Sequence, residues 1–347
     1  MREHSSAWAL PCGVPSPRPT ASRRPASAAG VVRLLAADVR AGTVGDLATW
    51  VTTDRARRGA VATRAPGGAL RRAEPGPCGP LVLEARPDPR GVALAVWGPA
   101  ATPAHVAERA LADAGAWAGL GERAGGFADL VAAHPVLRAL QRRLGTPRLS
   151  RVPRLGEAFG RAVLGQLVQS LEARRSTAQV AVMAGEEAAG GLWCWPTAAR
   201  IGATPAWALR RCGVSLRGAR ALHAAAVADQ RLAEGVGDWP ALDARLRALS
   251  GVGVWTSAET RLALGDPDAV SVGDYHLPAL IGTVLGGGPV DAPRASWTDA
   301  GMLALLAPYA GQRGRVIRLV VAGVAAGLVA RPARRAPRAA LSAHRYW

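Results

Sequence analysis

The stretch LSGVGVWT, residues 249–256, places two glycines between two segments whose apolar residues recur at helical spacing. Leu242 and Leu246 share one helical stripe before the glycines, and Trp255 and Leu262 share another after them. Glycines between two such segments are typical of a tight turn. The pattern therefore predicts a helix, a glycine turn and a second helix over residues 242–264.

Gly251 and Gly253 would leave the backbone of this turn accessible. Because glycine has no side chain, backbone amides can approach a ligand closely, and amides that open a helix lie at the positive end of its dipole. Such amides suit a phosphate oxygen, so the turn is predicted to hold nucleic acid. The stretch SVGDYH, residues 271–276, follows the second helix, and its Asp274 would meet whatever the turn delivers.

This arrangement resembles the helix-hairpin-helix DNA glycosylases, and within them the DNA-3-methyladenine glycosylase II group. Further motifs match that group in the same order: GQLV at residues 165–168, WPTA at 195–198 and LRGARA at 216–221. The resemblance implies a mainly α fold, in which a helical glycosylase domain follows a small α+β domain with an antiparallel sheet. It also implies a monofunctional enzyme of base excision repair that flips an alkylated purine, such as 3-methyladenine, out of double-stranded DNA and hydrolyses its glycosidic bond without a cofactor.

Asp274 is the candidate catalytic residue. Breaking the C1′–N bond places positive charge on the sugar, and a fixed carboxylate can stabilise that cation or orient the attacking water. The alternative interpretation is that Asp274 caps a helix predicted over residues 275–285, and both roles can coexist. Asp266 and Asp268 flank Pro267 in a turn-forming run, so turn formation is their natural explanation.

Trp255, Tyr309 and Leu167 are the candidate substrate-binding residues. The indole of Trp255 can stack on an extruded cationic purine, and a core tryptophan is the competing interpretation. Tyr309 is either a second pocket wall or a packing residue. Leu167 matches the family residue that fills the gap left by a flipped nucleotide, yet it also continues a stripe with Phe159 and Val163 that is typical of a buried helix.

The candidate DNA contacts come from the hairpin and from two other segments that match the family: Gly251, Gly253, Thr256, Gln166 and Arg313. Arg313 has a solvated arginine as its alternative interpretation. Glu259 occupies a position where the family can carry an aromatic residue, which leaves open a glycosylase for oxidised or deaminated bases. A noncatalytic helix-hairpin-helix DNA-binding protein is the third alternative, and Asp274 and Trp255 argue against it.

The composition favours a polyanionic partner, because the chain of 347 residues has a net charge of +18. All 43 basic residues are arginines. A glycosylase that also nicks the strand through a side-chain Schiff base needs a lysine amine, so the absence of lysine predicts a monofunctional enzyme. In bifunctional relatives, that lysine stands where this chain has Trp255.

The chain is predicted to divide into a disordered basic leader over residues 1–30, the small α+β domain over 31–118, the helical domain over 119–330 and a basic tail over 331–347. Short apolar runs at residues 31–35, 59–62, 80–84 and 91–97 predict the antiparallel strands. The four cysteines lack metal-cluster spacing, so no metal is expected. No run of apolar residues is long enough to span a bilayer, and we expect a cytoplasmic monomer.

Overall fold

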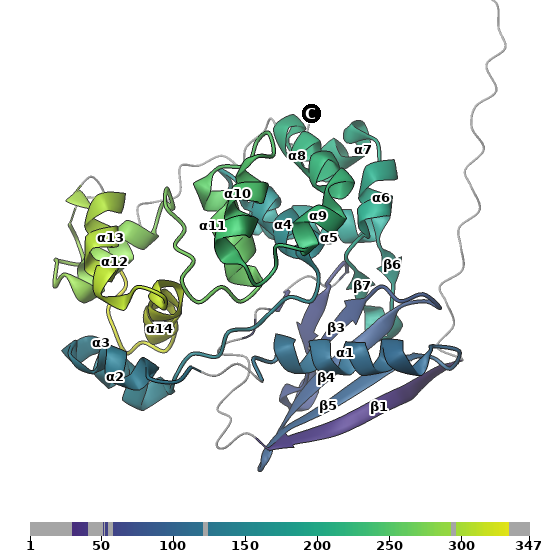
Figure 1. The fold of residues 1–347 in the computed structure, drawn as a ribbon, viewed down its shortest axis with the longest axis horizontal. Helices are drawn as coiled ribbons and strands as arrows, with labels where there is room; N and C mark the ends of the chain where they lie inside the picture. The colour runs from purple at the N-terminus through teal and green to yellow at the C-terminus, as the bar shows by residue number, and fades with distance from the viewer. Residues whose placement is uncertain are drawn as a thin grey trace, which may run out of the picture.

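The computed structural model describes residues 30–40, 51, 53–54, 58–120, 124–292 and 296–332. These residues form a five-stranded antiparallel sheet, a helix that packs on it, and two groups of helices beside it (Figure 1). This architecture confirms the predicted fold class. The leader predicted over residues 1–30 and the tail predicted over 331–347 lie almost entirely outside the described residues.

The strands of the main sheet are β1 (Val31–Arg40), β2 (Ala62–Arg64), β3 (Leu70–Glu74), β4 (Leu81–Asp88) and β5 (Gly91–Pro99), and a short pair is formed by β6 (Glu186–Glu187) and β7 (Trp193–Cys194). The α-helices are α1 (Ala104–Trp117), α2 (Phe127–Ala132), α3 (Pro135–Leu144), α4 (Leu155–Gly165), α5 (Ser170–Ala184), α6 (Ala198–Ala203), α7 (Ala206–Arg211), α8 (Leu216–Val227), α9 (Asp229–Ala233), α10 (Trp239–Arg247), α11 (Val254–Ala263), α12 (Leu277–Leu285), α13 (Asp299–Leu306) and α14 (Arg313–Ala325).

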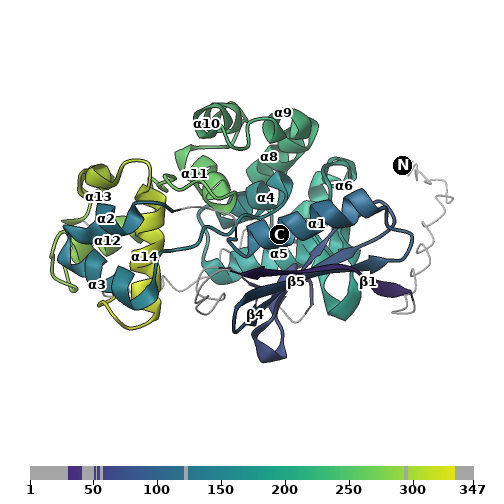
Figure 2. The same cartoon turned by 60° about the horizontal axis from the view of Figure 1, so that its bottom comes forward.

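The main sheet has the strand order β1-β5-β4-β3-β2, and all its neighbouring strands are antiparallel. Side chains alternate across it, as the pleat requires. On β4, Leu81 and Leu83 pack in one core with Trp117 of α1, whereas Val82 packs in another with Cys194 of β7. The turned view shows α1 lying across one face of the sheet (Figure 2). The sheet is thus covered on both faces.

Three of the predicted strands are present and extend further than their apolar runs, but the run at residues 59–62 was assigned wrongly. Strand β2 begins only at Ala62, and Gly59 adopts φ +83° ahead of it, beside α5. The amides of Val61 and Ala62 donate to Oδ2 of Asp54 at 2.8 and 3.1 Å. A Cβ atom at Gly59 would lie 2.3 Å from the carbonyl oxygen of Ala178. Strand β3, with the sequence LRRAE, was not predicted, since its charged residues hide the apolar alternation.

The helices surround two separate apolar cores. One core joins α4 to α11 and includes Phe159, Leu209 and Leu242. The other joins α2 and α3 to the C-terminal helices α12 to α14 and includes Leu137 and Ile281 (Figures 1 and 2). The loop from α11 to α12, which carries Asp274, therefore connects the two groups of helices.

A buried network of charges joins the sheet to α4. Arg72 of β3 is buried and forms ion pairs of 2.5 Å with Glu74 and with Glu157 of α4. Arg161, one turn further along α4, pairs with Glu157 at 2.9 Å and with Asp54 at 2.8 Å. Burial raises the pKa of Asp54, but the charge of Arg161 outweighs burial and holds that pKa below its usual value. Removing one member would strand a buried charge, which is strongly destabilising.

Candidate functional site

The predicted helix-turn-helix is formed by α10 and α11, with the two glycines between them. Gly251 has φ +90°, a left-handed conformation that favours glycine. Gly253 is exposed and precedes the first residue of α11, which has no side-chain cap. Helix α11 therefore begins with backbone amides that no side chain caps, as the predicted phosphate-binding turn requires.

Gln166 connects this hairpin to the end of α4. Its side-chain amide donates hydrogen bonds to the carbonyl oxygen of Gly251 at 3.1 Å and to Oγ1 of Thr256 at 2.8 Å. The Thr256 side chain is buried and turned inward, so it is not a surface contact for DNA. Only the backbone amide of Thr256 therefore remains a predicted DNA contact. Gln166 serves to fix the hairpin against the turn that follows α4.

Leu167 lies in that turn and is 100% exposed. Helix α4 ends at Gly165, because Gln166 has an extended backbone that interrupts the helix. The stripe from Phe159 and Val163 consequently does not continue, and the buried-helix interpretation of Leu167 is wrong. Leu167 also has φ +54°, the left-handed region that costs a branched side chain free energy. An exposed leucine in a strained conformation at the surface is a candidate for function rather than for packing.

Trp255 opens α11 and is half-buried between α4 and the Asp274 loop. A Cβ atom at Gly165 would lie 3.1 Å from Cη2 of the indole, so the ring packs directly against the end of α4. The indole Nε1 donates a hydrogen bond of 3.2 Å to Oδ2 of Asp274. Two candidates from separate motifs are thus in direct contact.

Asp274 is held on its other oxygen by the backbone. Oδ1 accepts hydrogen bonds from the amides of His276 at 2.7 Å and Leu277 at 2.9 Å. These bonds hold the backbone just ahead of α12, which begins at Leu277 rather than at residue 275 and has His276, without a side-chain cap, at its N-cap position. The interpretation of Asp274 as the N-cap of a helix over residues 275–285 is therefore wrong. The neighbouring Gly273, with φ +85°, donates its amide to Oδ1 of Asp299 at 3.2 Å. The carboxylate is therefore fixed in orientation and half-exposed at the junction of the two helix groups.

Asp266 and Asp268 have structural partners. Asp266 is buried, pairs with Arg261 and accepts the amide of Asp268 at 2.9 Å. Asp268 accepts hydrogen bonds from Arg313 Nε at 2.8 Å and from the Arg313 amide at 3.0 Å. Burial raises the pKa of Asp268, but these bonds outweigh burial and hold that pKa below its usual value. The Arg313 side chain is bound to Asp268, so we do not retain it among the proposed DNA contacts.

Tyr309 lies in the core formed by α2, α3 and the C-terminal helices, and only 7% of it is exposed. Burial raises the pKa of its hydroxyl. It is a packing residue, as one of the two sequence interpretations had it, and we do not retain it as a pocket wall.

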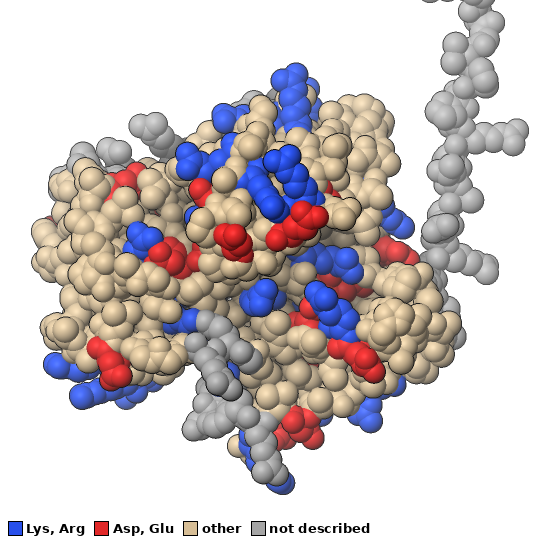
Figure 3. Space-filling model, viewed as in Figure 1, with Lys and Arg blue, Asp and Glu red and all other residues tan. Residues whose placement is uncertain are grey.

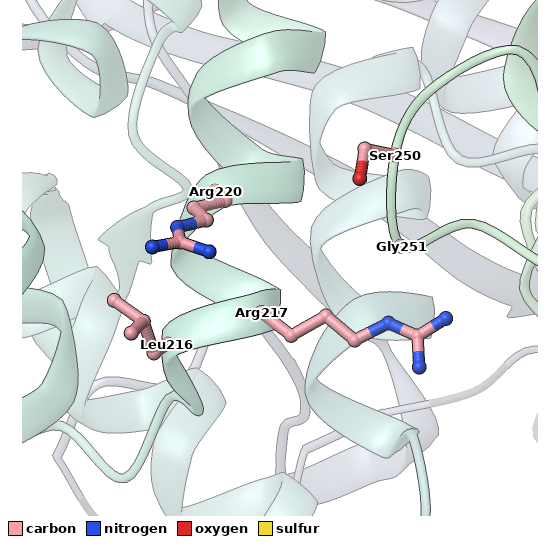
Figure 4. Close-up of a pocket in the computed structure, with 5 residues that line it drawn as sticks. All are labelled: Leu216, Arg217, Arg220, Ser250 and Gly251. Carbon is pink, nitrogen blue, oxygen red and sulfur yellow. The ribbon is translucent and has the colours of Figure 1, made fainter.

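A basic cleft lies beside the hairpin and was not selected from the sequence. It has a volume of about 410 Å³ and is lined by Leu216, Arg217, Arg220, Ser250 and Gly251 (Figure 4). Arg217 extends from α8 toward the hairpin, and a Cβ atom at Gly251 would lie 3.1 Å from Arg217 Cγ. Arginine side chains gather on this face of the molecule over α8 to α10 (Figure 3). The signal in the sequence was the spacing of three between the arginines in LRGARA, which places both on one side of a helix.

The overall fold is similar to that of solved DNA glycosylases. A 3-methyladenine DNA-glycosylase from Archaeoglobus fulgidus matches with a TM-score of 0.62 and 18% sequence identity, over 75% of this chain and 88% of that chain. An 8-oxoguanine glycosylase/lyase from Clostridium acetobutylicum, in complex with double-stranded DNA, matches with a TM-score of 0.57 and 12% identity, over 77% of this chain and 88% of that chain. This chain has the helix-hairpin-helix DNA glycosylase fold.

No family model and no curated protein matches the sequence. The two solved glycosylases are named for different lesions, so the glycosylase fold alone does not select a substrate. Among the described residues of this glycosylase fold, no helix combines the length and apolar character needed to cross a membrane.

Proposed function

We propose that the protein is a monofunctional DNA glycosylase that removes alkylated purines, such as 3-methyladenine, from double-stranded DNA. The observation that carries this proposal is the Asp274 carboxylate, which is oriented by two backbone amides and by Trp255 beside the hairpin. A carboxylate held in this way needs little reorganisation when positive charge develops on the sugar, and such preorganisation is a large contribution to catalysis.

DNA is proposed to bind across the hairpin and the basic cleft. The amides that open α11 would contact one backbone phosphate, and Arg217 and Arg220 would contact phosphates beside it. Leu167 would enter the stack at the position of the flipped nucleotide, since it is fully exposed and connected to the hairpin through Gln166. An apolar wedge offsets part of the cost of opening the stack, which is a few kcal/mol.

The flipped base is proposed to meet Trp255. An indole attracts a cationic ring through its quadrupole, and alkylation at a ring nitrogen makes a purine cationic. Such a base also departs without a strong general acid, which fits a site where a single carboxylate acts on the sugar. Asp274 would stabilise the sugar cation and orient the water that attacks C1′.

Base release tests this proposal. Methylated duplex DNA should lose alkylated purines in the presence of the wild type, and Asp274→Asn should lower the single-turnover rate on the order of a hundredfold or more while binding to abasic DNA persists. Asp268→Asn, a change of the same chemistry in the same loop, should affect the rate much less. A near-normal rate for Asp274→Asn would refute the assignment and leave the noncatalytic DNA-binding alternative.

The product tests the monofunctional assignment. Because the chain contains no lysine, the strand should remain intact at the abasic site until alkali or an endonuclease is added. Borohydride should trap little covalent adduct. Strong trapping together with strand cleavage by the pure protein would show a bifunctional enzyme.

A second candidate function is the removal of oxidised or deaminated bases. The half-buried Glu259 favours it, since it lies on α11 one turn beyond Trp255 and brings a carboxyl group near the proposed base pocket. Duplexes that contain hypoxanthine or 8-oxoguanine, assayed beside methylated DNA, distinguish the two candidates by their relative rates of base release.

A further inference from the structure

Glu259 is a half-buried acid to which the proposed removal of alkylated purines gives no role. Its Oε1 accepts a hydrogen bond from the hydroxyl of Ser271, which is itself buried. Ser271 begins the loop that carries Asp274, and its carbonyl oxygen accepts the Asp274 amide at 3.1 Å. One side chain of α11 is therefore connected to the backbone of Asp274 through a single serine.

The loop is attached to α11 at two points. Glu259 holds its first residue, Ser271, and Trp255 holds the Asp274 side chain at 3.2 Å. The two α11 residues are four apart, so they lie on the same side of the helix, one turn from each other. A loop bonded at both ends to one rigid helix has little freedom to displace the carboxylate that it carries.

The surroundings of Glu259 raise the pKa of its carboxyl group above the usual value. Burial raises the pKa of its carboxyl group, and the negative charge of Asp274 raises it further, while the Ser271 hydrogen bond and Arg318 of α14 act in the opposite direction. Arg318 is half-buried, and desolvation lowers its pKa to about 10; it donates to the carbonyl oxygen of Leu262 at 2.7 Å. The carboxyl group can accept the Ser271 hydrogen bond in either protonation state.

We propose that Glu259 is a positioning residue for base release, which fixes the Asp274 loop to the hairpin helix by accepting the hydrogen bond of Ser271. The consequence for base release rests on the proposed function, whereas the attachment of the loop does not. A displacement of about 1 Å at a reacting group can cost on the order of a hundredfold in rate. Loss of the attachment should accordingly slow the chemistry without weakening DNA binding.

The test uses four variants of the full chain. Glu259→Leu and Ser271→Ala remove the bond, and Glu259→Gln keeps an acceptor oxygen without a charge. The matched control is Ser257→Ala, because Ser257 is also a buried serine that bonds to a carboxylate. It lies on α11 and donates to Oδ1 of Asp243, on α10, at 2.6 Å. Each is measured by hydrogen exchange of residues 271–277 and by single-turnover base release from methylated DNA, with thermal unfolding confirming that each is folded.

Exchange at residues 271–277 should rise in Glu259→Leu and Ser271→Ala but not in Glu259→Gln or Ser257→Ala. Base release should fall by tenfold to a hundredfold in the first two, at unchanged affinity for abasic DNA, and stay within about threefold of wild type in the others. Unchanged exchange in Glu259→Leu and Ser271→Ala overturns the proposal whatever the activity. Raised exchange with a wild-type rate also overturns it, as does a Glu259→Gln rate as low as that of Glu259→Leu.

A wild type that releases no base would refute the proposed function instead. The exchange data would then still decide whether Glu259 holds the loop.

Discussion

The indole Nε1 of Trp255 and the Oδ2 of Asp274 are 3.2 Å apart and share a hydrogen bond. This bond ties the proposed base-stacking surface to the proposed catalytic carboxylate, although the two residues come from separate motifs. Gly165 supports the indole from the other side, since a Cβ atom there would lie 3.1 Å from the ring. The position of the indole relative to the carboxylate is thus set by a chain of contacts from the end of α4 to the start of α12.

Replacing Leu167 by glycine should separate function from stability. The free energy of unfolding should stay within about 1 kcal/mol of the wild type, because relief of the left-handed strain offsets the greater chain entropy of glycine. Base release from duplex DNA should slow clearly, since nothing then fills the gap in the stack. Thermal unfolding and single-turnover kinetics measure the two effects. Leu171→Ala, a change at another exposed leucine, is the control, and a marked loss of stability in Leu167→Gly would show that Leu167 is a packing residue.

The two hairpin glycines should respond differently to alanine. Gly251→Ala should lower the free energy of unfolding by about 1–2 kcal/mol, because alanine is strained at φ +90° and its Cβ would crowd Arg217 Cγ at 3.1 Å. Gly253→Ala should remain as stable as the wild type, since its φ is −100° and the space around its Cβ position is open. A bulkier Gly253→Leu should weaken binding to damaged and undamaged duplexes alike. Chemical denaturation and duplex titrations provide the measurements, and equal stability of both alanine variants would contradict the turn geometry.

Arg217→Ala and Arg220→Ala should each lower the salt dependence of duplex binding. Loss of one phosphate contact reduces the slope of log affinity against log salt concentration by about 1. Arg143→Ala on α3, also an exposed arginine, should leave the slope unchanged. Binding titrations at several salt concentrations give the slopes, and a wild-type slope in both cleft variants would remove the cleft from the proposed interface.

The Asp268–Arg313 pair should contribute stability that depends on pH. The folded state holds the pKa of Asp268 below its usual value of 3.8, so the contribution is present above that value and is lost as the pH falls through the lowered pKa. Asp268→Asn should therefore melt at a lower temperature than the wild type at pH 7, and the difference should shrink in acid. The effect should be modest, because the two side chains are 26% and 34% exposed and screened by solvent. A difference that is constant between pH 7 and pH 2 would argue against this pair.

The hairpin could be predicted from the sequence because both of its signals are local. Helical periodicity and glycine at a turn depend on residues close in the chain. The interpretation that the buried helical stripe continues to Leu167 was wrong. No glycine or proline directly after residue 165 marks the end of α4 in the sequence. The helix ends there because Gln166 turns away to bond Gly251 and Thr256, which are about ninety residues later in the chain.

The roles of charged residues depended most on tertiary structure. Arg313 resembles a surface contact in the sequence, but its partner Asp268 lies 45 residues away. Strand β3 was missed for the same reason, because Arg72 and Glu74 are buried with ion-pair partners far along the chain, Glu157 of α4 and Arg154 just before it. Periodicity treats a charged side chain as exposed, so it cannot recognise a buried pair.

The charge network around Arg72 joins the N-terminal sheet to α4, the helix that precedes the turn carrying Leu167. Glu157, in the first turn of α4, pairs with Arg72 of the sheet, Arg161 in the middle of the helix pairs with Asp54, and Leu167 lies two residues beyond the helix end. A shortened protein without β3 and Asp54 would retain the hairpin and Asp274 but would leave the buried Glu157 without the guanidinium of Arg72. The sheet lies apart from the proposed chemistry. It would nevertheless be as necessary for opening the base stack as Leu167, the residue proposed to enter that stack.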